Sequence, residues 1–302
     1  MPDHDPTSTP DDAEAADTAL ARLDAWMAAS PWHPRLTPFF VYISVFAVIA
    51  FLADRALGLY PALYVVQCGV VVWLLWRYRR LIPELNWRFH WLAIPTGVGL
   101  CGAWVALGYG YNRLVEGDRA LRPLAEDETF GPLAEASPVL FWVTLILRLL
   151  GMSIVVPMFE ELFTRSAVLR GLSNARKTGI GVIQLLCDLP VIGDWLMHTN
   201  WGKRAGVKHG VFVEQFRATA VGKLTFFGVF ASTLVFMLNH LPRDYAGCVA
   251  CGLVWCGLLW WTNRPALPEH KRQGLGPIVW SHGITNAALW AWTLYTGDWQ
   301  FL

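Results

Sequence analysis

The 302-residue chain is 55% hydrophobic and only 16% charged, with 17 tryptophans and a net charge of +1. This composition is typical of an integral membrane protein. The near-neutral charge and the lack of basic runs interleaved with aromatic residues exclude nucleic acid as the expected partner. Cys248 and Cys251 form an isolated CxxC inside an apolar run. We interpret them as packing residues and not as a metal or redox site.

Residues 1–34 are interpreted as a disordered, acidic N-terminal tail. Residues 1–19 are rich in Asp, Pro, Thr and Ala and contain no Lys or Arg, so they lack the basic start and apolar middle of a signal peptide. Seven apolar segments follow, and a span needs about 20 such residues. We therefore predict an all-α, polytopic membrane helix bundle of about seven transmembrane helices. The predicted spans are residues 38–53, 59–76, 91–111, 139–172, 224–241, 245–262 and 276–295.

Lys and Arg in the connections between these spans predict the orientation. The side that holds the N-terminus carries 17 of them, and the opposite side carries five. The positive-inside rule then places the N-terminus in the cytoplasm and the C-terminus outside. The cytoplasmic segment 173–223 contains an apolar stretch, GIGVIQLLCDLPVIGDWL, which we expect to be interfacial or re-entrant. Asp188, Pro190 and Asp194 would be costly at the middle of the bilayer.

Two adjacent carboxylates and an arginine follow the most apolar stretch of the chain, in FEELFTR at residues 159–165. Ionisable groups inside a span by default mark a function or an ion pair. Glu161 and Arg165 are four residues apart on one helical face and are predicted to pair, whereas Glu160 is rotated by one residue and lacks such a partner. An unpaired carboxylate in a low-dielectric place holds a proton more readily, so it can act as a general base near neutral pH.

Two later helices carry hydrogen-bonding side chains at the same four-residue spacing. Phe236 and His240 lie in LVFMLNHLP, and His282 and Asn286 lie in WSHGITNAALW. A lone histidine in a helix is more often a satisfied structural residue than a catalytic one. Three helices that each present such groups on one face favour an internal, water-filled site.

The depth of this site depends on the helix that carries the glutamates. If that helix ended at Pro157, Glu160 would lie at the cytoplasmic surface, too far from His240 to share a water molecule. We therefore expect the helix to continue through Leu172 with a bend at Pro157, which moves Glu160 nearer to the middle of the membrane.

EExxxR, FxxxH and HxxxN, in this order within apolar helices, resemble the three motifs of the CPBP family. This family comprises CAAX-type prenyl endopeptidases and bacteriocin-processing or immunity relatives, also called Abi proteins, and its proteases are intramembrane glutamic endopeptidases. The resemblance covers residues 139–302, which would form the protease core with a cytoplasmic or interfacial insertion at about 173–223. Residues 35–138 would be N-terminal transmembrane helices, and they carry no family motif.

The resemblance implies a role for each motif residue. Glu160 would activate water, His240 would help to hold that water, and His282 and Asn286 would donate hydrogen bonds to the oxyanion. Glu161, Arg165 and Phe236 would be supporting residues, and no cofactor would be needed. The implied partners are the lipid bilayer of the cell inner membrane and a membrane-embedded or lipidated protein that is cleaved near its C-terminus.

A narrower resemblance points to a bacterial system. EELFTRSAVLRGL, VEQFRATAVGKLTF and SHGITNAALWAWTLYTGDWQ are similar to the branch that is encoded with exosortases, which process proteins bearing a C-terminal sorting signal. A functional link to an exosortase system is therefore expected.

The sequence leaves two alternative functions and the partner of Arg148 open. Glu160, His240 and His282 would also satisfy a two-His, one-Glu zinc site, so a zinc-dependent intramembrane protease is an alternative. A bacteriocin-immunity or transport protein is a non-enzymatic alternative, because buried Glu and His chains also occur in pumps. Arg148, about three turns before Glu160, has three candidate partners: lipid headgroups, the C-terminal carboxylate of a substrate, and Asp54.

Overall fold

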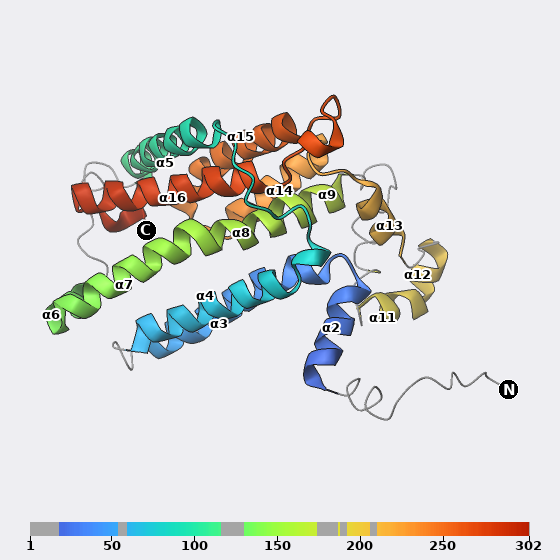
Figure 1. Cartoon of the computed structure of the whole chain (residues 1–302), viewed down its shortest axis with the longest axis horizontal. Coiled ribbons are helices and arrows are strands. Elements are labelled where there is room, and N and C mark those ends of the chain that lie inside the picture. The colour runs from blue at the N-terminus through green and yellow to red at the C-terminus, as the bar shows by residue number, and fades with distance from the viewer. Residues whose placement is uncertain are drawn as a thin grey trace.

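The computed structural model describes residues 18–53, 59–115, 130–173, 187, 192–205 and 210–301. Every regular element in these ranges is a helix, which confirms the predicted all-α class. A long helix over residues 138–172 runs through the middle of the bundle and packs against the short helix α14 (Phe226–Leu238). In Figure 1, α3 (His33–Ala53) and α4 (Tyr60–Arg77) lie on one side of it. On the other side lie α5 (Ala93–Val115), α15 (Tyr245–Asn263) and α16 (Gly276–Thr296).

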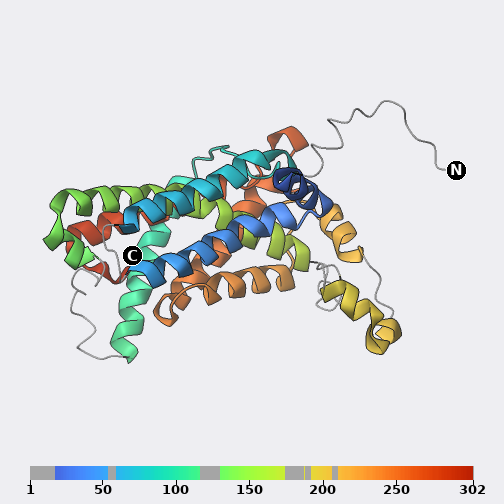
Figure 2. The ribbon, with the colours of Figure 1, turned by 90° about the horizontal axis from the view of Figure 1, so that it is seen from below.

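The helices of each group pack against one another. α3 and α4 lie side by side in both views (Figure 1 and Figure 2). They contact each other extensively, and α5 and α16 also contact each other extensively. One large apolar core joins α3, α5, α15, α16 and the long helix. The outward side chains of the long helix are themselves apolar, and Trp142, Ile146 and Leu150 are about half exposed. Such a surface suits contact with lipid and not with water.

Four described helices are long and apolar enough to cross a membrane, which indicates a membrane protein. They are Tyr60–Arg77, Ala93–Val115, Pro138–Leu172 and Pro242–Asn263. Two shorter apolar helical stretches are His33–Ile49, which is part of α3, and Phe226–Leu238, which is α14. Each of the seven predicted segments contains a helix in the described residues, but a count of seven spans is not confirmed.

The remaining predicted spans fall short for local reasons. α14 ends at Leu238, and Pro242 follows four residues later, so the helix has only 13 residues. α16 has 21 residues, yet its buried face carries His282 together with Ser281, Thr285 and Thr293, and these polar groups lower its hydropathy.

The predicted boundary of the N-terminal tail is wrong. Residues 1–17 lie outside the described residues, but α2 (Ala19–Ala29) is a helix, and Thr18 caps it by accepting a hydrogen bond from Ala21 N. Met27 is 1% exposed and packs with Leu74 and Tyr78 of the α4 end. Leu20, Leu23 and Met27 recur at helical spacing, so α2 presents an apolar stripe that the acidic composition upstream concealed.

The described part of the predicted insertion consists of short helices. α11 (Ile192–His198), α12 (Asn200–Ala205) and α13 (Val211–Ala218) lie at the end of the bundle that holds α2 (Figure 1). None of these three helices is long enough to cross a membrane. Most of the apolar stretch at residues 179–196 lies outside the described residues, so its predicted interfacial or re-entrant position stays a prediction.

The structure brings the basic connections together at one end of the bundle. Leu275 N donates a hydrogen bond to Glu84 O (2.8 Å), and Arg88 Nη1 donates to Arg272 O (2.6 Å), so the connections at 77–90 and 263–275 are neighbours. The C-terminus lies towards the opposite end (Figure 1). This arrangement agrees with the predicted sidedness of the connections, while the orientation in a membrane stays a prediction.

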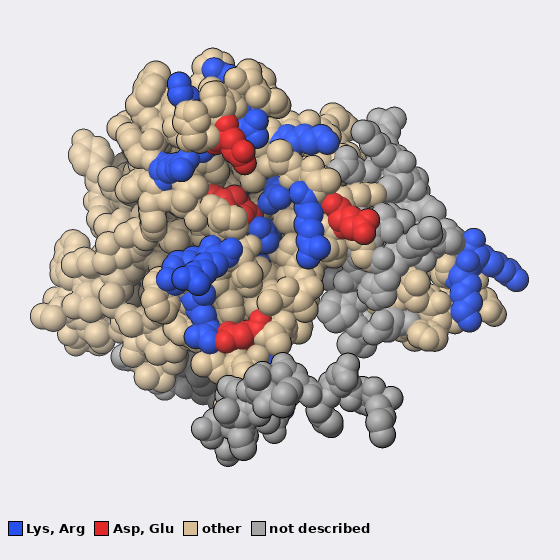
Figure 3. Space-filling model, turned by 45° about the vertical axis from the view of Figure 1, so that its right-hand side comes forward, with Lys and Arg blue, Asp and Glu red and all other residues tan. Residues whose placement is uncertain are grey.

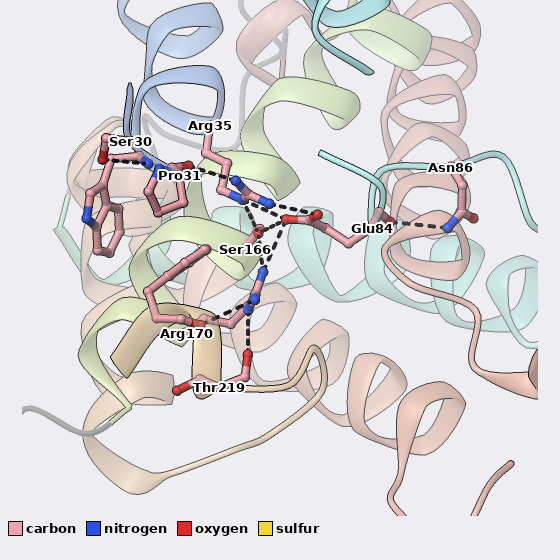
Figure 4. Close-up of polar contacts among 10 residues, drawn as sticks. Ser30, Pro31, Arg35, Glu84, Asn86, Ser166, Arg170 and Thr219 are labelled. Carbon is pink, nitrogen blue, oxygen red and sulfur yellow. Dashed lines mark hydrogen bonds and ion pairs between the residues drawn. The ribbon is translucent and has the colours of Figure 1, made fainter. Parts of the chain in front are cut away.

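A buried ionic cluster anchors the long helix at this end (Figure 4). Glu84 is 7% exposed and receives two hydrogen bonds from Arg35, of 2.7 and 2.9 Å, and a third from Arg170 (3.2 Å). Ser166 Oγ also donates to Glu84. Burial alone raises the pKa of Glu84, but the charges of Arg35 and Arg170 and the bonds from Arg35 and Ser166 outweigh it, so its pKa lies below the ordinary value.

Candidate active site

The helix that carries the glutamates is unbroken, but it changes its winding twice. Its parts are α7 (Pro138–Leu150), η4 (Gly151–Val155), α8 (Val156–Glu161), η5 (Leu162–Val168) and α9 (Leu169–Leu172), of which η4 and η5 are π-helical. The predicted continuation through Leu172 is confirmed. Pro157 is the second residue of α8, which follows η4 directly, and the wider turn accommodates a residue that lacks an N–H. π-Helical turns are frequent at functional sites.

Glu161 and Arg165 form the predicted ion pair. Arg165 Nε lies 3.3 Å from Glu161 Oε2, and both side chains are fully buried. The guanidinium also lies 4.8 Å from the ring centre of Phe236 and donates a hydrogen bond to Thr164 Oγ1 (2.6 Å). The phenylalanine of FxxxH therefore covers the charge of the EExxxR arginine, which is a cation–π contact that helps to hold a buried cation.

Glu160 faces a cavity, whereas Glu161 does not. The side chain of Glu160 is 16% exposed and that of Glu161 is 0% exposed. Only Glu160 of the two lines the cavity, which has a volume of about 300 Å³. This difference agrees with the helical spacing, which predicted that the two carboxylates point in different directions.

His282 lies between the two carboxylates. Its Nδ1 is 2.9 Å from Glu161 Oε1, and its Nε2 is 3.8 Å from Glu160 Oε2. A carboxylate at hydrogen-bond distance fixes the hydrogen of a neutral ring on Nδ1, which leaves Nε2 towards Glu160. The second distance is too long for a direct hydrogen bond. Trp255 stacks on the ring at 4.3 Å between centroids and holds its plane.

His240 reaches the same cavity from the end of α14. Its Nδ1 lies 2.8 Å from Phe236 O, and because a carbonyl only accepts, Nδ1 carries the hydrogen. The ring also packs edge-on against Trp104 of α5. Nε2 of a neutral His240 is then left as an acceptor. The structure thus brings His240 and Glu160 to one cavity, as the continuous helix predicted.

Asn286 joins α16 to the first π-helical turn. Its Nδ2 donates a hydrogen bond to Met152 O (2.8 Å), and the side chain lines the cavity. The amide carries a second N–H, which can serve another acceptor. Gly283 permits this contact, because a Cβ at that position would lie 2.3 Å from Ser153 O. The HxxxN segment therefore needs a residue without a side chain between its two polar groups.

All four predicted catalytic residues, namely Glu160, His240, His282 and Asn286, line this one cavity. Arg148 lines it as well, while Asp54, one of its predicted partners, lies outside the described residues. The sequence did not single out Trp104, Trp255 or Arg243, which also contribute to the walls. The two tryptophans carry no spacing signal, since tryptophan is frequent throughout the apolar helices.

Both histidines of the possible zinc set use Nδ1 for another partner. Nδ1 of His282 is hydrogen-bonded to Glu161, and Nδ1 of His240 is hydrogen-bonded to Phe236 O. Within the described ranges, no three His, Cys, Asp or Glu side chains are grouped in an arrangement that could hold a metal ion.

No family model, curated protein or solved structure matches the chain.

Proposed function

We propose that the protein is an intramembrane endopeptidase of the glutamic type, with the cavity around Glu160 as its active site. The observation that supports this most strongly is the position of His282 between Glu160 and Glu161, on helices whose exposed side chains are largely apolar. A carboxylate that lines a cavity beside an oriented imidazole is a suitable pair for moving protons to and from a water molecule. The motifs that resemble the CPBP family contribute these same residues.

In the proposed reaction, Glu160 removes a proton from water, and the water oxygen attacks the carbonyl carbon of a peptide bond. His240, whose Nε2 is an acceptor, helps to hold that water. The proton then passes from Glu160 to the nitrogen of the leaving amine, the C–N bond breaks, and the products are a carboxylic acid and an amine. One water molecule is consumed, and Glu160 returns to its starting state.

The negative charge on the carbonyl oxygen needs a donor in a site of low polarity. We assign this role to the second N–H of Asn286, because the first is held by Met152 O and fixes the amide in place. His282 contributes through Nε2 when its ring is protonated. Preorganised donors of this kind account for a large part of the rate in acyl-transfer enzymes. Glu161 acts by orienting His282, and Arg165 acts by keeping Glu161 in place.

The proposed substrate is a membrane-embedded or lipidated protein that is cleaved near its C-terminus. The cavity lies among apolar helices and is walled by aromatic rings, among them Tyr42, Phe46 and Trp104. An extended polypeptide or a lipid chain suits such walls better than a free polar metabolite does. A functional link to an exosortase system belongs to this proposal, on the basis of the sequence resemblance.

The test compares cells of the source organism that carry either the wild-type protein or Glu160→Gln. Mass spectrometry of protein termini in membrane fractions should find new C-termini with the wild-type protein that disappear with Glu160→Gln. The matched control is Glu135→Gln, the same change at an exposed glutamate, which should leave the termini unchanged. Equal sets of termini from wild-type and Glu160→Gln cells, with equal amounts of folded protein, would contradict the proposed function.

A further inference from the structure

A second cavity, of about 590 Å³, lies at the end of the bundle where the basic connections meet. It is formed by the segment before α5 and by the connection between α15 and α16, and it shares no residue with the candidate active site. We call it the basic pocket. It is lined by Arg88, Phe89, His90, Trp261, Thr262, Arg264, Leu267, His270, Lys271 and Gln273.

The charge of the basic pocket is of one sign. Arg88, Arg264 and Lys271 contribute three cations, and no lining residue is acidic. The surrounding face of the molecule also carries more Lys and Arg than Asp and Glu side chains among the residues coloured in Figure 3. Three cations that converge on one cavity without a carboxylate among them attract an anion, and a phosphate group suits both guanidinium and ammonium donors.

Hydrogen bonds between side chains and the main chain hold the walls of the basic pocket in place. Arg88 Nη1 donates to the carbonyl oxygens of Arg272 (2.6 Å) and His270 (3.4 Å), which ties one wall to the other. Asn263 and Gly274 exchange two hydrogen bonds, of 2.8 and 2.9 Å, and so close the connection that carries Arg264 and Lys271. The cavity is therefore built by the fold and not by flexible side chains alone, which lowers the entropic cost of binding.

One cation of the basic pocket is also fixed by its neighbours. Arg264 Nη1 donates to Trp261 O (3.1 Å), and its guanidinium lies 4.1 Å from the ring centre of Trp261. Only one of its nitrogens is used by that hydrogen bond, so the guanidinium retains further donors. An arginine held over an indole ring presents the remaining donors in a defined direction.

Exposed aromatic side chains surround the basic pocket. Trp87, Phe89, Trp91, Trp261 and Trp280 are between 37% and 66% exposed. Trp280 packs against Trp87 and Phe89, and its Nε1 donates to Trp87 O (3.2 Å). Tryptophans that stand at the ends of apolar helices are typical of the level where lipid headgroups meet acyl chains. At this level, the expected ligand is a lipid headgroup and not a phosphate dissolved in water.

We propose that the basic pocket binds the phosphate headgroup of an anionic phospholipid. Arg264 and Lys271 contact the phosphate, Arg88 adds positive charge, and the acyl chains lie along the exposed aromatic side chains beside it. Basic pockets between membrane helices on one side of a bilayer are a recurrent form of lipid recognition. The site would select lipids by headgroup charge, and it is independent of the proposed peptidase activity.

Native mass spectrometry of the detergent-purified full chain tests this proposal, with dioleoyl phosphatidylglycerol and dioleoyl phosphatidylcholine as probes. The wild-type protein should retain the anionic lipid in preference to the neutral one. Arg264→Gln with Lys271→Gln should weaken phosphatidylglycerol binding by about tenfold or more, because each basic residue contributes to the attraction of an anionic headgroup. Lys271→Glu alone, a change at an exposed position, should also weaken phosphatidylglycerol binding. Phosphatidylcholine binding should not change.

The matched control is Lys203→Gln with Arg204→Gln, which removes the same charge from exposed positions of α12 outside the pocket. It should lower phosphatidylglycerol binding by less than about twofold. An equal loss in this control would show general surface attraction and would overturn the proposal. Unchanged binding by both pocket variants would overturn it too. Competition by inorganic phosphate at the lipid's own concentration would overturn the assignment of a lipid.

Discussion

His282 Nδ1 lies 2.9 Å from the buried carboxylate of Glu161, while its Nε2 faces Glu160 across 3.8 Å. The two neighbouring glutamates therefore have different partners and different surroundings. Glu161 is bound on both sides, by His282 and by Arg165, and is fully buried, whereas Glu160 lines the cavity. Under the proposed function, Glu161 has a structural role and Glu160 a chemical one, and the first two predictions test the structural role of Glu161.

Glu161→Ala should destabilise the protein, because it leaves the guanidinium of Arg165 buried without its carboxylate. The expected loss is about 3–5 kcal/mol, which is the usual cost of breaking a buried pair from one side. Thermal unfolding in detergent measures it, and loss of activity should accompany loss of folded protein. A Glu161→Ala protein that is as stable as the wild type but inactive would move Glu161 into the chemistry.

Removing both charges should cost less than removing one. Arg165→Met leaves the Glu161 carboxylate without its cation, whereas Arg165→Met combined with Glu161→Gln leaves no uncompensated charge at all. The double variant should therefore unfold at a higher temperature than Arg165→Met alone. If the losses of stability in Arg165→Met and in Glu161→Gln add up strictly in the double variant, the 3.3 Å contact between the two side chains does not contribute.

Gly283→Ala should disturb the active site without changing any polar group. The added Cβ would lie 2.3 Å from Ser153 O, so α16 has to move away from η4, and the hydrogen bond from Asn286 to Met152 O lengthens. Activity and stability should both fall. The control is Gly257→Ala in α15, where nothing lies within 4 Å of the added Cβ. This change should be neutral or stabilising by up to about 1 kcal/mol.

Much of the candidate site could be predicted from helical spacing, and the rest could not. The pair Glu161–Arg165 and the different direction in which Glu160 points are properties of one helix, so helical spacing predicts them. The π-helical turns that flank Glu160 change the winding locally, and no interval of 3.6 residues signals them. The contacts of His282 with Glu161 and Trp255 join segments that are far apart in the chain, and an apolar helix rich in tryptophan does not indicate which ring is used.

The fold could likewise be predicted only where the signal lies within one segment of the chain. Apolar length predicted the four described helices that are long enough to cross a membrane, because burial in lipid needs only composition and extent. The ionic cluster of Glu84 joins Arg35 to Ser166, residues 131 positions apart in the chain. Its members belong to three separate segments of the chain, so no spacing along a single helix signals their contact. The helix α2 was missed because the acidic residues before it dominated the composition of the first 34 positions.

Glu84 should make stability depend on pH in the acidic range. Because folding lowers the pKa of this carboxyl, its stabilisation is fully present above the unfolded pKa, which is about 4. It is lost as pH falls through the lower pKa of the folded state. Glu84→Gln should lower the unfolding temperature at pH 7 and flatten its decline towards pH 3. The same substitution at the exposed Glu269 should leave the curve of the wild type unchanged. Parallel curves for wild type and Glu84→Gln would contradict the charged cluster.

The last prediction distinguishes glutamate chemistry from zinc chemistry at the same residues. A side-chain amide suits an oxyanion but is a rare zinc ligand. Asn286→Ala should therefore lower the rate of a glutamate enzyme by about 10²–10³-fold, the typical effect of one lost oxyanion donor. The purified enzyme should also keep its activity in a strong chelator. The measurement is cleavage of a membrane-tethered peptide in detergent, alongside elemental analysis of the same sample.

The matched control for that experiment is Asn239→Ala, at an exposed asparagine whose amide donates to the backbone of its own helix, at Val235 O (2.6 Å). Asn239 also lines the cavity, so Asn239→Ala removes an amide from the same walls without removing the contact to η4. It should keep most of the wild-type rate. Near-stoichiometric zinc, loss of activity in the chelator, recovery with added metal, and a normal rate for Asn286→Ala would together replace the glutamate mechanism with a zinc mechanism. The assignment of the cavity as a protease site would then still stand, because Glu160, His240 and His282 line it in either case.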